Sequence, residues 1–147
     1  MNIHGAIDLE TGQTIMKDVL SVDALSTILL LTAIETLYPG MRLIHVFLDN
    51  ARYHHAKLVQ AWLAMPDRRI RLHLVPTYCP HLNPIERSWG LMHGHTTHNK
   101  CYATFKDFSA AMLTFPRDDV PTNWRQWRDQ VTDDFRIINP TEFRIIG

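Results

Sequence analysis

An almost unbroken apolar run at residues 43–48, LIHVFL, is the feature that most constrains the fold of this chain. Runs of this kind are typical of a strand buried on both faces. The run stops at Asp49-Asn50. Asp49 is therefore expected at the carboxyl end of a strand, which is where ligand sites gather in open α/β sheets.

A helical pattern and a second strand follow. Apolar residues recur at helical spacing over residues 58–63, and Pro66 closes the pattern. Residues 70–74 then alternate between apolar and polar side chains. This order predicts a βαβ unit with a right-handed crossover, so its two strands should be parallel and adjacent.

The segment after this unit returns the chain towards Asp49. Its three prolines, within residues 76–84, exclude both a helix and a sheet interior and predict a loop. Asn83 has the character of a helix N-cap with Pro84 at the first helical position, which places Glu86 in the first turn. We expect the loop to bring Glu86 near the strand end that carries Asp49.

Two segments, VFLDNARYHHA and LVPTYCPHLNPIERSW, together resemble the DDE superfamily endonuclease domain of mariner-like insertion-sequence transposases. The similarity extends to HNKCYATFKDF and DDFRIINPTEFRII. It implies an α/β fold of the ribonuclease-H-like type, with a mixed sheet flanked by helices. It also implies that Asp49 and Glu86, 37 positions apart, are the family's second and third catalytic carboxylates.

The resemblance implies a chemistry as well. Carboxylates from different elements would hold two Mg²⁺ or Mn²⁺ ions about 4 Å apart for phosphodiester cleavage. Water would be the nucleophile for nicking, and a DNA 3′ hydroxyl would be the nucleophile for strand transfer into target DNA. Further candidates for orienting a carboxylate or contacting DNA are Asn50, Arg52, His54, Asn83 and Arg87.

The family's first catalytic Asp ends a strand upstream of the hairpin that NIHGAIDLETGQTIMKDV resembles. The given sequence begins at that hairpin, so we expect the sheet to lack its first strand. Asp8 precedes a turn at residues 10–12 and is interpreted as a turn acid. The alternatives are that Asp8, Asp18 or another chain supplies the third carboxylate.

Simpler interpretations exist for both carboxylates. Glu86 opposite an N-cap Asn83 is also a capping arrangement, worth at most about 2 kcal/mol. Asp49 is also a suitable turn or helix-capping acid. Spacing alone favours these structural roles, whereas the family resemblance favours catalysis.

Composition excludes several other classes. The spacing of His93, His95, His98 and Cys101 matches no recognised zinc pattern, and no G-x-S-x-G motif is present. Two cysteines make a disulfide framework improbable and favour a reducing cytoplasm. The sequence shows no signal peptide and no apolar run near the roughly 18 residues of a membrane span.

The charge is zero overall but unevenly distributed. Residues 50–106 hold eight Lys/Arg against two Asp/Glu, and seven of the nine His. The segments on either side are acidic. A basic surface beside the site would attract a phosphate backbone; the alternative is that these side chains are scattered over solvated faces.

Other patterns predict the remaining elements. Residues 2–8 and 14–20 read as an antiparallel hairpin. Ser21 is expected to cap a helix that ends at Pro39-Gly40, with its apolar positions at 22, 25, 28, 29 and 37.

Towards the C-terminus, Thr104 should cap a helix with Asp107 at N3. Its core-facing stripe is expected to comprise Phe105, Phe108, Met112 and Phe115. A polar loop over residues 116–123 should precede a helix whose Trp124, Trp127 and Val131 share one side. Core packing is favoured for these tryptophans over stacking on exposed bases.

These patterns favour one α/β domain over residues 1–147. The resemblance implies that this domain is the catalytic domain of a cut-and-paste DNA transposase, truncated at its N-terminus. The alternative is a non-catalytic remnant that binds DNA or pairs with a full-length transposase through an exposed sheet edge. Homo-oligomers are an expected form of either.

Overall fold

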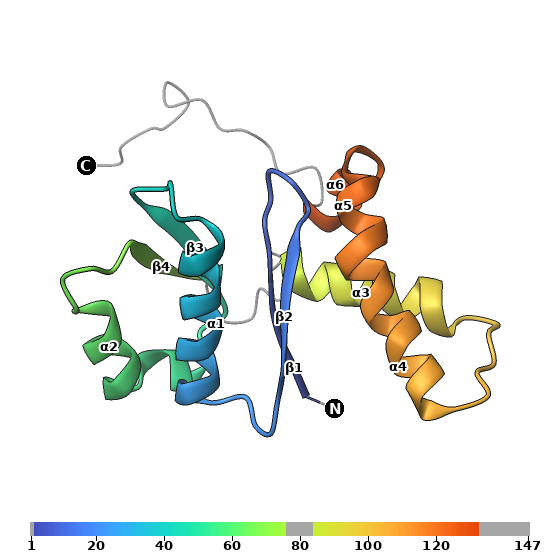
Figure 1. Ribbon diagram of the computed structural model, residues 1–147, viewed down its shortest axis with the longest axis horizontal. Coiled ribbons are helices and arrows are strands. Elements are labelled where there is room, and N and C mark those ends of the chain that lie inside the picture. The colour runs from blue at the N-terminus through green and yellow to red at the C-terminus, as the bar shows by residue number, and fades with distance from the viewer. Residues whose placement is uncertain (1, 76–83, 133–147) are drawn as a thin grey trace, which may run out of the picture.

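The computed structural model describes residues 2–75 and 84–132. It is a mixed α/β arrangement of two small sheets with helices, the class predicted from the sequence (Figure 1). The elements in chain order are β1 (Asn2–Ile7), β2 (Thr14–Val19), α1 (Ala24–Leu37), β3 (Ile44–Leu48), the 3-10 helix η1 (Arg52–His55), α2 (Lys57–Leu63), β4 (Ile70–Leu74), α3 (Pro84–Thr97), α4 (Phe105–Thr114), the π-helix η3 (Phe115–Asp119), α5 (Val120–Thr122) and α6 (Trp124–Thr132).

The predicted hairpin is confirmed: β1 pairs antiparallel with β2. Asp8 closes its turn, since its Oδ1 accepts hydrogen bonds from the Glu10 and Thr11 main-chain N–H groups at 2.8 and 3.3 Å. Its Oδ2 accepts a hydrogen bond from the Tyr38 hydroxyl. Asp8 is thus engaged as a turn acid, the role that the sequence favoured.

The βαβ unit is also confirmed. β3 pairs parallel with β4, and α2 lies in the crossover between them. The predicted burial of both strand faces is wrong, however, because Phe47 is 59% exposed and His45 is exposed with it. Ile44 and Val46, on the other face, pack against the core that contains α1.

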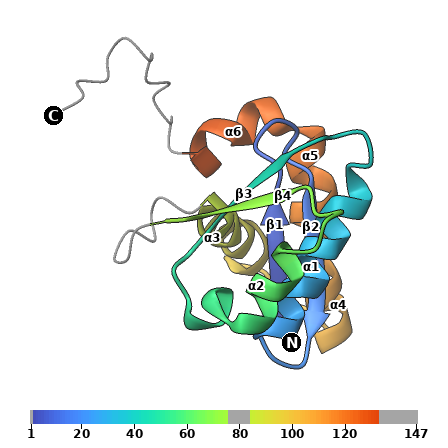
Figure 2. The ribbon, with the colours of Figure 1, turned by 90° about the vertical axis from the view of Figure 1, so that its left-hand side faces the viewer.

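Helix α1 joins the two sheets into one core. Its Leu30, Leu31 and Ile34 are buried against residues of the hairpin and of the β3–β4 pair. Figures 1 and 2 both show α1 beside these strands. The predicted apolar face was wrong, since Leu25 and Leu29 are 63% and 60% exposed.

The cap of α1 also differs from the prediction. Asp23, and not Ser21, is the N-cap. Its Oδ1 accepts from the Ser26 N–H at 2.9 Å, and the Ser26 Oγ accepts from the Asp23 N–H at 2.8 Å. The reciprocal pair satisfies two helix-end donors, which explains why the helix starts two residues later. Ser21 instead donates its hydroxyl to the Asp23 carboxylate at 2.5 Å.

A second core lies on the other side of the hairpin. Met92 of α3, Met112 of α4, Phe115, Val120 and Trp127 are buried together there. Core packing of Trp127, which is 8% exposed, is therefore confirmed.

Two predictions for this region were wrong. Phe105 is 69% exposed rather than part of the core stripe. The loop expected over residues 116–123 is instead helical over residues 115–122. Because this segment is helical, Phe115 and Val120 both lie in the second core. Among the described residues, no helix has the length and apolar character needed to cross a membrane.

Candidate active site

Asp49 follows the last residue of β3, as predicted. The Val75 N–H donates to the Leu48 carbonyl at 2.7 Å, so β3 remains paired with the β4 side up to this point. The Asp49 Oδ1 accepts from the Ala51 N–H at 3.3 Å and turns the chain towards η1. The carboxylate is nevertheless 56% exposed and stays available to a ligand.

His54 of η1 contacts this carboxylate from the buried side of the site. Its side chain is 5% exposed, and its Nδ1 lies 2.9 Å from the Asp49 main-chain O and 3.2 Å from Oδ1. An N–H at Nδ1 donates to both oxygens. The Tyr53 ring packs edge-on against the imidazole, at 4.4 Å between centroids and 78° between planes. The buried imidazole therefore restricts the rotation of Asp49.

Glu86 lies in the first turn of α3 and is exposed. Its carboxylate is therefore accessible to a ligand from solvent. Asn83, the predicted N-cap, lies outside the described residues. Pro84 is the first residue of α3, as expected from the sequence.

The phenol of Tyr53 is influenced by both carboxylates. Burial raises the pKa of its phenol, and the negative charges of Asp49 and then Glu86 raise it further. Tyr53 also packs against His54, the residue that contacts Asp49.

The other sequence candidates take different positions. Asn50 accepts a hydrogen bond from His55 Nε2, so it interacts with η1. Arg52 is exposed at the start of η1. Arg87 donates from Nε to the Gln130 carbonyl at 2.9 Å and connects α3 to α6. The structure thus places His54 directly on Asp49, whereas Asn50 and Arg87 have structural contacts.

Sequence reasoning missed His4 of β1. Its Nδ1 lies 3.3 Å from the Ser26 Oγ at the start of α1. Burial lowers the pKa of His4, and so does the neighbouring His54, while Asp49 opposes the shift. His4 therefore belongs to the surroundings of Asp49. The only signal in the sequence was its alternation with Ala6 on one strand face, which carries no information about a partner.

The donor types of the site suit a hard cation. Mg²⁺ binds carboxylate oxygens and often uses only one or two of them while it keeps several waters. Asp49 and Glu86 are both exposed and provide such oxygens. Over residues 2–75 and 84–132, no three His, Cys, Asp or Glu side chains gather as a metal-binding group.

Comparison with known proteins identified one family. A family model described as DDE superfamily endonuclease matches residues 1–109. The matched segment runs from the hairpin into α4 and includes both carboxylates. No curated protein and no solved structure matches the chain.

Proposed function

We propose that this chain, which belongs to the DDE superfamily endonuclease family, is the catalytic domain of a DNA transposase. The transposase would be of the mariner-like insertion-sequence type. Its reaction would be cleavage of DNA phosphodiester bonds at element ends, followed by strand transfer. The observation that carries this proposal is the family match over residues 1–109, a segment that contains both Asp49 at the end of β3 and Glu86 in the first turn of α3.

Asp49 and Glu86 are the residues that would hold Mg²⁺ or Mn²⁺. Bound divalent ions would supply activation of the attacking oxygen and stabilisation of the leaving oxygen. The chain's own contribution is orientation, because the buried His54 imidazole fixes Asp49. Glu86 would contribute its exposed carboxylate from the first turn of α3.

A missing strand is part of the same proposal. β1 and β3 each have one hydrogen-bonded neighbour among the described strands, and α1 packs on both sheets. Ala6 of β1 packs on the same α1 core as Ile44 and Val46 of β3, which supports a position of β1 on the side of the β3–β4 pair. One more strand, from sequence upstream or from another subunit, would join the sheets into a ribonuclease-H-like sheet and supply the third carboxylate.

DNA is the proposed partner. Arg52 and Lys57 follow Asp49 at exposed positions, and Arg71 is exposed on β4. Cations at such positions favour a phosphate backbone by counterion release. The chain would act in the cytoplasm or nucleoid as a homo-oligomer.

A second candidate function is a non-catalytic remnant that binds DNA or a full-length transposase. It is favoured by one observation: in the described part of the chain, no third acidic or histidine side chain joins Asp49 and Glu86 in a metal-binding group. An unpaired sheet edge would be its means of pairing with a partner.

Nicking of supercoiled plasmid in Mg²⁺ or Mn²⁺ distinguishes the two candidates. The proposal predicts metal-dependent nicking that falls by at least about 100-fold in Asp49→Asn and in Glu86→Gln. Asp67→Asn, an exposed acid in the turn after α2, is the matched control and should keep wild-type activity. If the protein does not nick DNA, and if Asp49→Asn and Glu86→Gln bind DNA as tightly as the wild type does, the remnant is favoured.

A further inference from the structure

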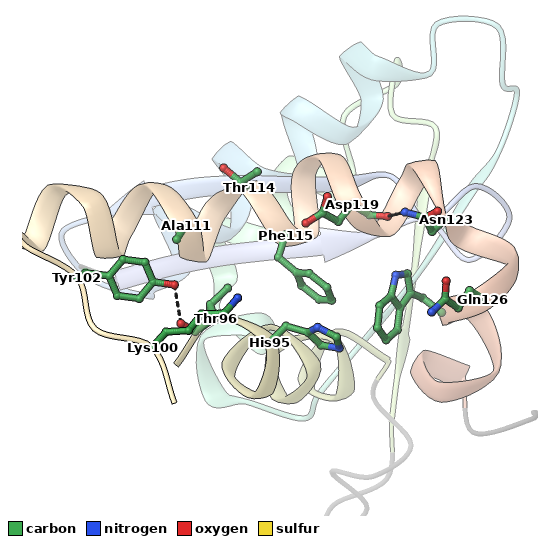
Figure 3. A pocket seen from close by; sticks show the side chains of 11 residues that line it. His95, Thr96, Lys100, Tyr102, Ala111, Thr114, Phe115, Asp119, Asn123 and Gln126 are labelled. Carbon is green, nitrogen blue, oxygen red and sulfur yellow. Dashed lines mark hydrogen bonds between the residues drawn. The ribbon is translucent and has the colours of Figure 1, made fainter. Parts of the chain in front are cut away.

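A cavity of about 450 Å³ lies between α3 and the segment from α4 to α6 (Figure 3). Binding pockets for small molecules span roughly 300–1,000 Å³. The side chains that determine its chemistry are His95, Lys100, Phe115, Asp119, Gln126 and Trp127. Its lining is therefore part aromatic and part polar.

The cavity is separate from the proposed catalytic carboxylates. Glu86 and His95 are nine positions apart in α3. At 1.5 Å and 100° per residue, this spacing corresponds to about 14 Å along the helix and about half a turn around it. A ligand in the cavity would therefore lie on the opposite side of α3 from Glu86.

An aromatic stack forms one wall of the cavity. The His95 ring lies parallel to the Phe115 ring, at 4.8 Å between centroids and 12° between planes. It also meets Trp127 at 4.6 Å and 87°. Phe115 and Trp127 are 4% and 8% exposed and are fixed by the core, whereas His95 is exposed. Part of a rigidly supported imidazole thus remains accessible to a flat ring.

Polar groups lie on either side of this stack. In Figure 3, Lys100 lies near Tyr102 at one end, and Asn123 and Gln126 lie at the other. The Tyr102 hydroxyl is already used, because it donates to the Thr96 carbonyl at 2.6 Å. Within the described residues, the Lys100 ammonium and the Gln126 side-chain amide have no hydrogen-bond partner or ion pair. Both groups are available to a ligand.

We propose that this cavity binds a single nucleotide. The base would stack on His95, its edge would hydrogen-bond to Gln126 and Asp119, and its phosphate would meet Lys100. Aromatic side chains stack on bases of any sequence, and amides and carboxylates pair with base edges. A purely apolar ligand would make no use of Lys100 and Asp119, and a lone phosphate would make no use of the aromatic wall.

Two sources share this chemistry: a free mononucleotide, and a nucleotide unstacked from a DNA strand. Only the second rests on the proposed function. Calorimetric titration with deoxynucleoside 5′-monophosphates, with deoxyribose 5-phosphate and with a short single-stranded oligonucleotide separates them. Tighter binding of the oligonucleotide than of any mononucleotide identifies DNA as the source; the reverse order identifies a free nucleotide.

Variants test the cavity itself. His95→Ala should weaken mononucleotide binding by about tenfold or more, because it removes the stacking surface. His95→Phe should retain binding, and the exposed His93→Ala on the same helix is the matched control. Lys100→Ala should weaken binding of the mononucleotide but not of the nucleoside, with exposed Lys106→Ala as its control.

The outcome is independent of the nuclease chemistry, since Asp49→Asn and Glu86→Gln should leave mononucleotide affinity unchanged. The proposal is overturned if no mononucleotide binds, if deoxyribose 5-phosphate binds as tightly as the nucleotide, or if His95→Ala and Lys100→Ala bind like the wild type. Circular dichroism of each variant checks that a loss of binding does not come from unfolding.

Discussion

One imidazole nitrogen of His54 contacts Asp49 twice, at 2.9 Å from its main-chain O and 3.2 Å from its Oδ1. The contact joins a side chain that is 5% exposed to one that is 56% exposed. Groups that orient a metal ligand typically contribute a 10- to 100-fold factor in metal affinity. His54 is therefore the structural support of the proposed site.

Loss of this support should be measurable. We predict that His54→Ala lowers Mn²⁺ affinity by about 10- to 100-fold. His54→Asn keeps an amide donor near the position of Nδ1 and should recover part of the affinity, whereas His55→Ala on the exposed side of η1 should not change it. Calorimetry supplies the affinities, and a thermal melt of each variant checks folding. Wild-type affinity in His54→Ala would contradict the positioning role.

His4 should make stability depend on pH. Burial, and then the neighbouring His54, hold the pKa of His4 below its usual value of 6.5, against the opposing charges of Asp49 and Asp23. The unfolded chain therefore binds more protons at His4 than the folded chain does as the pH falls through 6.5. The stability due to neutral His4 is present above that pH and is lost below it.

Urea unfolding of wild type and His4→Gln, at pH values on both sides of this range, tests the prediction. His4→Gln should lose less stability on acidification than the wild type does. The exposed His93→Gln is the control and should follow the wild type. Equal acid sensitivity in His4→Gln and wild type would contradict it.

Glu35 and Arg69 should be critical for stability. The Arg69 guanidinium donates to the Glu35 and Tyr38 carbonyls at 2.6 Å each, so it caps the end of α1. The Glu35 carboxylate, 9% exposed, accepts from the Arg69 N–H at 3.0 Å and pairs with Arg68 at 3.1 Å. Removing one partner of a buried ion pair leaves an uncompensated charge.

We therefore predict that Glu35→Ala lowers the free energy of unfolding by about 3 kcal/mol. Thr36→Ala, at the next and exposed position of α1, should change it by no more than about 0.5 kcal/mol. Denaturant unfolding provides both values. A Glu35→Ala effect as small as that of Thr36→Ala would show that the network contributes little.

Gly12 should not tolerate a side chain. Its φ is +74°, and a Cβ at this position would overlap the Trp124 ring. We predict that Gly12→Ala lowers the free energy of unfolding by at least about 1 kcal/mol. Gly40→Ala is the matched control, because nothing lies within 4 Å of a Cβ there. Equal stabilities of the two variants would contradict the close approach of Trp124 to the turn.

The βαβ unit could be predicted because its periodicities are strong and its crossover handedness is nearly fixed. The buried face of helix α1 was harder to predict, because apolar residues occur on nearly all sides of this helix. Leu25 and Leu29 are exposed while Ser26 and Thr27 are buried, so hydrophobic pattern alone pointed to the wrong face. The cap was also ambiguous, since Ser21 and Asp23 both carry suitable oxygens and the reciprocal bond to Ser26 decides between them.

Some residues of the candidate site could be predicted from the sequence, and others could not. Asp49 could be placed at a strand end, and Glu86 in a first helical turn, from local sequence together with the family resemblance. His4 could not be found, because its proximity to Asp49 depends on how β1 packs beside η1 and α1. His95 was considered only as a zinc candidate, since its stack on Phe115 joins residues from separate helices.

A calorimetric Mn²⁺ titration of the wild type beside the Asp49→Ala, Glu86→Ala double variant tests the central claim most directly, at a pH where both carboxylates are ionised. A double variant of two exposed acids elsewhere, Asp67→Ala with Asp107→Ala, controls for lost surface charge. We predict that the wild type and this control bind Mn²⁺ and that the Asp49/Glu86 variant does not. Indistinguishable titrations of all three proteins would contradict a metal site shared by Asp49 and Glu86.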